Sequence, residues 1–295
     1  MRSDLDDAIV SDARRYVLVD VFTEAPLQGN QLCVFTDARE LSPRVMQLLG
    51  RELNLSETVF VLPPERGGTV RIRIFTPTAE LPFAGHPVLG AAVVVASALQ
   101  SASVTLETGV GLVSVELRRE EGRAVFARMR QPVPSWRAYE REAELLQALG
   151  VERSGLPVEL CSNGPRHVFV ELESEEAVAA LSPDMRALAE LEGVCANCFA
   201  GEGMRWKTRM FAPGLGVAED PATGSAAGPL AVHLSRHGRI AFGDEIEIRQ
   251  GAEIGRPSVL FARAEGSAAE VEGVEVGGSA VVVARGEFLL PEGLG

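Results

Sequence analysis

Hydrophobic and polar positions alternate with a period of two along residues 70–75, where Val70, Ile72 and Ile74 are separated by arginines. This spacing predicts a strand with one buried face. Downstream, residues 88–99 are almost entirely apolar. A segment of that length with no polar side predicts a helix that is buried on every side. We expect the chain to be organised around this strand, the loop that follows it, and the helix.

Similar patterns elsewhere predict the remaining elements. Ser42 and Pro43 begin a predicted helix that runs to about Leu53, with the hydroxyl as its cap and the proline in its first turn. Further helices are predicted from Arg141 to Leu149 and from Ser182 and Pro183 onward. Period-two or short apolar runs predict strands at residues 16–22, 32–35, 58–62, 103–106, 112–117 and 125–129.

The second half of the chain repeats the order of the first half. Residues 209–213 (RMFAP) match residues 73–77 (RIFTP), and each is followed by a loop, a glycine and a helix of small apolar residues. Two copies of one α+β unit are therefore predicted. Such a duplication would bring the two helix N-termini, at residues 85–86 and 224–225, to face each other across a cleft between domains. Clefts of this kind are favoured ligand sites.

The repeat also predicts the domain boundaries. The first domain is expected to comprise residues 16–130, and the second residues 131–279, with the prolines near residue 132 as the link between them. Residues 1–15 are acidic and contain no apolar run of signal-peptide length, so we expect a frayed extension there.

The composition of the chain narrows the range of binding partners that we expect. The chain of 295 residues has a net charge of −13, which argues against nucleic acid or an anionic membrane surface as the main partner. The longest apolar run, around residues 91–99, is too short to span a bilayer. We therefore expect a cytoplasmic protein that acts on a small molecule. An anionic substrate would need a local positive site such as a helix N-terminus.

The four cysteines are expected to be reduced thiols. Cys195 and Cys198 form a C-x-x-C pair, but no second pair follows at the spacing of a zinc finger. Two small buried thiols are therefore a better interpretation than a metal or redox site.

Two helix starts form the candidate anion site. A buried helix start has unpaired N–H groups and the positive end of a dipole, and His86 would lie at the mouth of the first one. At the second, Asp220 has two possible roles. It could be an ordinary N-terminal cap, or it could lie beside Thr223 and Ser225 around a concave site for a carboxylate or phosphate.

Glu57 lies between a predicted helix end and an apolar strand. A solvated loop carboxylate is the default interpretation there. If the side chain instead points inward, desolvation would raise its pKa from about 4.3 toward neutrality, which suits a general acid–base. The pattern of residues alone leaves both interpretations open and favours the first.

Three motifs in order resemble one known family. They are Ser56-Glu57-Thr58-x-Phe60, Gly85-His86-Pro87-x-x-Gly90, and the run DPATGS at residues 220–225. Together they are similar to the signature of the PhzF (phenazine biosynthesis-like) family, and the likeness extends over roughly residues 16–290. Gln31 departs from it, since the family often has proline after the preceding Gly-Asn pair.

The resemblance implies the fold of diaminopimelate epimerase, which is α+β with two pseudo-symmetric domains, each a barrel-like sheet around a central apolar helix. It also implies that the last strand, about residues 280–290, crosses back so that residues 280–295 complete the first domain. Members of the family are usually homodimers and need neither a metal nor an organic cofactor.

The resemblance further implies an isomerase like trans-2,3-dihydro-3-hydroxyanthranilate isomerase, which moves a proton between ring carbons of a small cyclic carboxylic acid. It assigns Glu57 as the proton shuttle, with His86 and Asp220 completing the catalytic set. The groups expected to bind the substrate carboxylate are Gly85, Gly224, Ser225 and Ala226.

Other functions are considered beside this one. An amino-acid racemase or epimerase of the same fold would use a cysteine at each helix start, where this chain has His86 and Ser225. A non-catalytic protein that binds a small acid would have no need of Glu57. A metalloenzyme is disfavoured, because the one i,i+4 histidine pair, His233 and His237, is explained by cationic side chains at a helix C-terminus.

Overall fold

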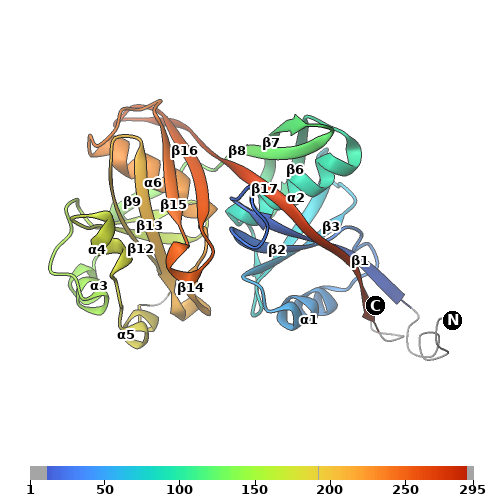
Figure 1. Ribbon diagram of the computed structural model, residues 1–295, viewed down its shortest axis with the longest axis horizontal. Helices are drawn as coiled ribbons and strands as arrows, with labels where there is room; N and C mark the ends of the chain where they lie inside the picture. Colours follow the sequence, from blue (N-terminus) through green and yellow to red (C-terminus); the bar gives the residue numbers. More distant parts are fainter. Residues whose placement is uncertain (1–11, 192, 291–295) are drawn as a thin grey trace.

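The computed structural model describes residues 12–191 and 193–290, and it forms two lobes side by side (Figure 1). Each lobe is a curved sheet wrapped around one helix, α2 in the first and α6 in the second. The strands of the described residues form one continuous hydrogen-bonded sheet that passes through both lobes. The fold is thus the predicted α+β arrangement of two pseudo-symmetric units.

The first lobe follows chain order from strand β1 to strand β8. Its elements are β1 (Asp12–Val21), β2 (Asn30–Phe35), α1 (Pro43–Leu53), β3 (Glu57–Leu62), β4 (Val70–Phe75), β5 (Glu80–Leu81), α2 (Gly85–Leu99), β6 (Ser103–Thr108), β7 (Gly111–Glu120) and β8 (Arg123–Arg130).

The second lobe repeats the plan with short additions. Its elements are β9 (Ser135–Ala138), α3 (Glu142–Leu149), β10 (Glu159–Ser162), β11 (Arg166–Glu171), α4 (Glu175–Ala179), α5 (Met185–Ala189), β12 (Cys195–Glu202), β13 (Arg205–Ala212), η1 (Pro213–Leu215), β14 (Val217–Asp220), α6 (Gly224–Arg236), β15 (Glu245–Gln250), η2 (Ala252–Ile254) and β16 (Ser258–Gly266).

The last strand, β17 (Val271–Leu290), belongs to both lobes (Figure 1). Its first part pairs with β16 of the second lobe, and residues 275–279 pair with β8 of the first. Residues 280–290 then run antiparallel to β1. One strand therefore connects the two sheets, and its C-terminal half completes the sheet of the first lobe.

The two central helices are buried as their composition requires. The residues of α2 from Gly85 to Val93 are all buried, and no residue in its first turn is acidic. Helix α6 is buried from Gly224 to Ser235. Apolar side chains of both helices belong to one continuous hydrophobic core, so the start of each helix is fixed firmly relative to its sheet.

The lobes are also joined by polar contacts near the first turn of the chain. The Arg256 guanidinium donates to Asp20 Oδ1 at 2.7 Å and to the Gly29 carbonyl at 2.9 Å. The N–H of Val259 donates to the carbonyl of Phe22 at 2.8 Å. These bonds hold the β1–β2 turn of the first lobe against residues 256–259 of the second lobe.

Several predicted elements are confirmed and some need correction. Ser42 caps α1 as predicted, accepting a hydrogen bond from the Val45 N–H at 3.4 Å. Ser182 does not begin a helix, because Asp184 is the cap of α5 and accepts from two backbone amides. Helix α4 was not predicted.

The predicted frayed extension is shorter than expected. Strand β1 begins at Asp12, and residues 12–15 pair with residues 287–290 of β17. The rest of the extension, residues 1–11, lies outside the described residues, as do residues 291–295 of the predicted first domain.

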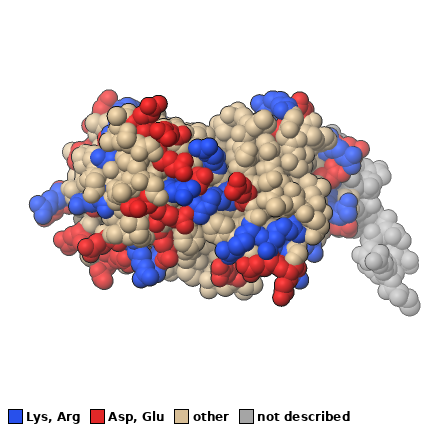
Figure 2. All heavy atoms as spheres, turned by 90° about the horizontal axis from the view of Figure 1, so that it is seen from above, with Lys and Arg blue, Asp and Glu red and all other residues tan. Residues whose placement is uncertain are grey.

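Charges of both signs are mixed over the face seen from above (Figure 2). Ion pairs also link the two lobes, among them Arg128 of β8 with Glu245 of β15 at 2.5 Å and Arg256 with Asp20 at 2.7 Å. Among the described helices, none combines the length and the hydropathy that a membrane crossing requires.

Candidate active site

Glu57 is the first residue of β3, and its position follows from the end of the preceding helix. Helix α1 ends at Leu53, and Asn54 adopts the left-handed conformation that turns the chain away. Three residues later the chain joins the sheet, where Glu57 pairs with Leu32 of β2 in parallel register. Its side chain is 16% exposed. The inward-pointing alternative is therefore confirmed, and the solvated-loop interpretation is wrong.

His86 meets Glu57 from the start of α2. Its Nε2 atom lies 3.3 Å from Glu57 Oε2, and its side chain is 5% exposed. Apart from each other, neither of these two atoms has a hydrogen-bond partner within the described part of the chain. Buried polar atoms are nearly always paired in folded proteins. An unpaired carboxylate oxygen and an unpaired ring nitrogen facing each other therefore indicate a place where a ligand or a proton is exchanged.

The electrostatics of this pair favour neutral groups. Burial, followed by the negative charge of Asp220, raises the pKa of Glu57 to about 8. Burial lowers the pKa of His86 to about 3, while a hydrogen bond to the Gln31 backbone acts in the opposite direction. At neutral pH the histidine is uncharged and the glutamate is mostly protonated. A carboxyl group that titrates near pH 8 is well placed to accept and return a proton.

We assign the tautomer of His86 from the groups around its ring. A bond that raises a histidine pKa is one in which the ring donates to a carbonyl, and Nε2 is the unpaired atom, so Nδ1 carries the proton toward Gln31. Nε2 is then a bare acceptor that faces Glu57. The protonated form of Glu57 can therefore donate to it.

Asp220 approaches the same space from the second lobe, at the end of β14. It is 7% exposed. Its Oδ1 accepts from Asn30 Nδ2 at 2.8 Å and its Oδ2 from Thr223 Oγ1 at 2.7 Å. Burial raises its pKa to about 6, although these two hydrogen bonds act to lower it. Asp220 is not the N-cap of α6, because the cap is Thr223 and no side chain bonds to the first amides of that helix.

Two residues that hold Asp220 in place were not predicted. Asn30, at the start of β2, links the lobes by donating to Asp220 and to the Ala222 carbonyl. Gln250, at the end of β15, donates to the Asp220 carbonyl and to Thr223 Oγ1. The sequence signal for Asn30 was its place between a glycine and an apolar strand, whereas Gln250 sits in an ordinary strand and gave no signal.

The two helix N-termini touch. A Cβ atom placed on Gly85 would lie 2.4 Å from the backbone carbon of Gly224 and 2.5 Å from the Ser225 nitrogen. Because only a glycine allows so close an approach, both positions are fixed by contact between the two helices. The prediction that the two starts face each other is confirmed.

The positive ends of both helix dipoles meet at this contact. In α2 the first helical bond runs from the Val88 N–H to the Ala84 carbonyl, so the N–H groups of Gly85 and His86 precede it. In α6 the Ala226 N–H already donates to the Thr223 carbonyl at 3.0 Å. The substrate-binding roles of Gly224, Ser225 and Ala226 stay predictions, and the amides of Gly224 and Ser225 are the ones free of this bond.

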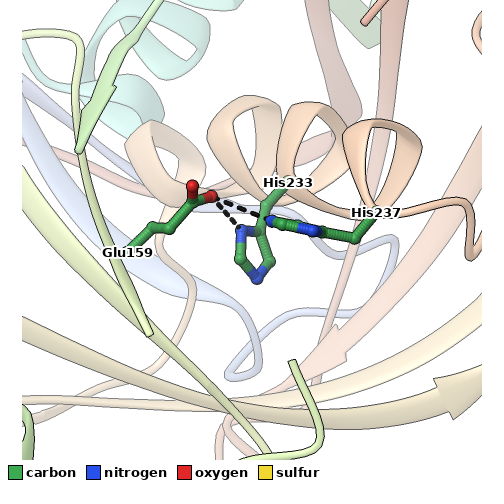
Figure 3. A group of neighbouring side chains, drawn as sticks. All are labelled: Glu159, His233 and His237. Carbon is green, nitrogen blue, oxygen red and sulfur yellow. Dashed lines mark hydrogen bonds and ion pairs between the residues drawn. The ribbon is translucent and has the colours of Figure 1, made fainter. Parts of the chain in front are cut away.

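The histidine pair at the end of α6 belongs to a separate cluster (Figure 3). His233 Nδ1 and His237 Nε2 both approach Glu159 Oε2, at 3.0 and 3.1 Å. Arg236 donates to the same oxygen at 2.8 Å. The predicted role in capping the helix is thus corrected, because these side chains bind a carboxylate of β10.

The contacts in this cluster are better explained by a structural role than by metal binding. Burial alone would raise the pKa of Glu159, but hydrogen bonds from the two histidines and Arg236 lower it to about 2. A metal ion at Glu159 would lie beside the positive guanidinium group and would displace three existing partners. The cluster holds the C-terminal end of α6 to the sheet.

The cysteines are buried free thiols, as expected. Burial raises the pKa of Cys33, Cys161, Cys195 and Cys198 to about 12 in each case. The two helix starts carry His86 and Ser225, so neither has the cysteine that a two-thiol racemase would use there.

A large cavity lies away from this site. A cavity of about 1370 Å³ opens on the second lobe beside Glu171, Trp206 and Arg239. The residues between the helix starts are instead closely packed, with 4% of His86 and 8% of Ser225 exposed. We place the candidate site at the helix starts because the unpaired titratable atoms lie there.

The fold, with its two paired helix starts, is of the epimerase-like class. The family model for phenazine biosynthesis-like proteins (PhzC-PhzF) matches residues 19–286. The chain belongs to this family and is an isomerase.

Relatives at high identity support this assignment. The trans-2,3-dihydro-3-hydroxyanthranilate isomerase of Pseudomonas fluorescens is 54% identical over 275 residues, which cover 93% of this chain and 99% of the relative. The protein with the same name from Pseudomonas aeruginosa is 52% identical and covers 94% and 99%.

Solved structures agree on the fold. A structure described as a predicted epimerase from Pseudomonas aeruginosa has a TM-score of 0.79 and 33% identity, and covers 94% of this chain and 99% of its own. A hydroxyproline epimerase from Agrobacterium vitis, with a TM-score of 0.67 and 13% identity over 96% and 94% of the two chains, shares the fold alone.

Proposed function

We propose that this isomerase moves a proton between ring carbons of trans-2,3-dihydro-3-hydroxyanthranilate or a closely similar cyclic, unsaturated carboxylic acid. The observation that carries the proposal is the unpaired, buried carboxyl group of Glu57, whose pKa is raised to about 8 beside an unpaired nitrogen of His86. The identity of 54% to an isomerase named for that substrate supports the choice of ring.

Glu57 is the proton carrier in this proposal. Its carboxylate takes the proton from the ring carbon that bears the hydroxyl group, and the electron pair of that C–H bond becomes part of the ring double-bond system. The double bonds shift, and Glu57 returns the proton to another ring carbon. The enol that remains at the hydroxyl-bearing carbon converts to a ketone. Over both steps one C–H bond and one O–H bond break and two C–H bonds form, so the reaction is redox-neutral and we propose that it needs no cofactor.

The other residues bind and orient the substrate. The amides of Gly85, Gly224 and Ser225 lie where two helix dipoles meet, a place that favours a carboxylate. His86, through the bare Nε2, accepts the proton of Glu57 or of the substrate hydroxyl. Asp220 keeps the pKa of Glu57 high by its negative charge and can accept a hydrogen bond from an amino or hydroxyl group of the ring.

The test is isotope incorporation in heavy water. Wild-type protein should convert the dihydro acid and introduce deuterium at the carbon that receives the proton. The Glu57→Gln variant should lose about 10³-fold in kcat, since general acid–base catalysis is worth about 10²–10⁴-fold, while binding of the acid by calorimetry is retained.

The control for that test is Glu140→Gln, the same substitution at a carboxylate whose side chain is 87% exposed. Its rate should match that of the wild type. Turnover by Glu57→Gln within a few-fold of wild type would show that another group carries the proton.

We also propose the assembly and location implied by the family resemblance. The chain would act as a homodimer in the cytoplasm, where its four free thiols stay reduced. Its domains would be residues 16–130 with 280–295, and residues 131–279. Light scattering on the purified protein checks the dimer, and a monomer at all concentrations would contradict it.

A further inference from the structure

Buried polar side chains that are hydrogen-bonded to one another lie behind Ser225, and they were not predicted from the sequence. His167, in β11, is fully buried. Its Nε2 lies 3.1 Å from Ser225 Oγ, and its Nδ1 lies 3.3 Å from Asn197 Nδ2 of β12. The three side chains therefore run in a line from the interior of the second lobe to the start of α6.

The direction of each hydrogen bond among these side chains can be worked out. Asn197 Nδ2 also donates to the Cys195 carbonyl at 2.8 Å. A carbonyl oxygen can only accept, so the nitrogen of this amide, and not its oxygen, faces both partners. An amide nitrogen can only donate, so His167 Nδ1 is an acceptor and carries no proton. Burial lowers the pKa of His167 to about 3, so the ring is neutral and its single proton is on Nε2.

We propose that Asn197 and His167 are positioning residues that make Ser225 an obligate hydrogen-bond donor to the carboxylate of the substrate. His167 donates its Nε2–H to Ser225 Oγ, which uses one lone pair of the hydroxyl. The proton of Ser225 is then free for an acceptor at the contact between the two helix starts. This inference rests on the proposed function for the identity of the ligand.

The same geometry excludes a nucleophilic serine. In a Ser–His–Asp triad the carboxylate accepts from Nδ1–H, which leaves Nε2 bare to take the serine proton. Here the amide donates to Nδ1, so Nε2 already carries a proton and cannot act as the base. These hydrogen-bonded side chains orient the Ser225 hydroxyl as a donor, and they do not activate it as a nucleophile.

A comparison with the first lobe shows that packing alone does not require these hydrogen-bonded polar side chains. His167 pairs with Cys195 across parallel strands just as Leu32 pairs with Glu57 in the first lobe. Leu32 is also fully buried. The apolar Leu32 therefore occupies the equivalent position in the first lobe, where the helix begins with His86.

Nitrogen-15 NMR of the histidine rings tests the tautomer directly. In wild-type protein the His167 signals, assigned by their loss in His167→Gln, should show a protonated Nε2 and a bare Nδ1. In Asn197→Asp the carboxylate accepts from Nδ1, so the proton should move to that atom. A wild-type ring protonated at Nδ1, or one that carries both protons at pH 7, would overturn the proposal.

Ligand affinity tests the consequence for Ser225. The probe is 3-hydroxyanthranilate, the stable aromatic form of the proposed ring system, measured by calorimetry. Asn197→Asp, His167→Leu and Ser225→Ala should each weaken it about 10- to 100-fold, since hydrogen bonds to charged groups are worth about 1.5–3 kcal/mol. His167→Gln can still donate to Ser225 and should keep most of the affinity. Affinities within threefold of wild type in both Asn197→Asp and His167→Leu would overturn the proposal.

Two controls separate this role from a general loss of structure. The probe 2-aminophenol has the same ring without the carboxylate, and its affinity should change little in any of these variants. In turnover, KM should rise while kcat stays within a few-fold, because the bond to the carboxylate is made in both ground and transition states. A fall in kcat with unchanged KM would contradict the proposed role.

Failure of this proposal is distinguishable from failure of the proposed function. The NMR and calorimetry experiments need no turnover, so they remain decisive even if Glu57→Gln stays active. Should Asn197→Asp or His167→Leu not fold, His167→Gln and Ser225→Ala still provide the affinity comparison. Equal weakening of 3-hydroxyanthranilate by these two variants would overturn the inference.

Discussion

The two lobes have the same strand–loop–helix framework, but they carry different chemistry at equivalent positions. Strands β2 and β3 place Glu57 in the first lobe, where β11 and β12 place Cys195 in the second. The helix starts likewise carry His86 in one copy and Ser225 in the other. A symmetrical scaffold thus holds a carboxyl group on the first side and a hydroxyl group on the second.

The other half of the comparison concerns Asp220. It pairs with Met210 on β13, as Leu81 pairs with Ile74 on β4. The acidic residue therefore has an apolar counterpart in the first lobe. The difference teaches that duplication brings two helix dipoles close together, whereas the titratable side chains beside them differ between the copies.

Among changes that test the comparison of the two lobes, the largest expected effect comes from forcing them apart at their point of contact. In Gly85→Ala the new Cβ would lie 2.4 Å from Gly224 backbone carbon, so one helix start must shift. We expect kcat/KM to fall at least about 100-fold, because misplacement by about 1 Å costs that much. Steady-state kinetics measure the loss. The control Gly50→Ala, whose Cβ would have 3.3 Å to its nearest neighbour, should retain activity. Near-normal kinetics for Gly85→Ala would show that helix contact is dispensable.

An intermediate effect is expected on the pH profile, through the charge that one lobe exerts on the other. Glu57 must be ionised to accept a proton, and its pKa is raised to about 8. The kcat/KM of wild type should therefore rise about tenfold per pH unit up to about pH 8 and then level off. Since the Asp220 charge contributes to that high pKa, Asp220→Asn should move the bend to lower pH. A bend that stays in place or moves upward in the variant would refute this coupling.

The smallest effect is expected at the counterpart of Glu57. Cys195 is 5% exposed, and burial together with the charges of Asp220 and Glu57 raises its pKa to about 12. A thiol of that kind is not ionised at working pH. We expect Cys195→Ala to keep kcat/KM within about threefold and to lower the free energy of unfolding by about 1 kcal/mol. A loss comparable to that of Glu57→Gln would mean that both lobes supply a proton carrier.

Much of this arrangement is readable from the sequence because it depends on local pattern. The apolar run after His86 predicts a buried helix, and the repeat of RIFTP as RMFAP predicts a second one facing it. Family motifs then place Glu57 and Asp220 at the site. These features depend on the order of residues within short segments, which periodicity and repeats record.

The parts of the site that the sequence does not predict depend on contacts between segments that are distant in the chain. Asn30 meets Asp220 across 190 positions of sequence, and His167 meets Ser225 across 58. Nothing in their neighbouring residues marks these side chains as partners. For the same reason, the inward orientation of Glu57 could be stated as an alternative but not decided from the residues alone.

The course of β17 has a consequence for how the protein is made. Synthesis proceeds from the N-terminus, and domains commonly fold in that order. Here β1 cannot gain its partner at residues 280–290 until nearly the whole chain has left the ribosome. The lobe that contains Glu57 is translated first and finished last, so a nascent chain cut short before its final strand would leave β1 as an open sheet edge.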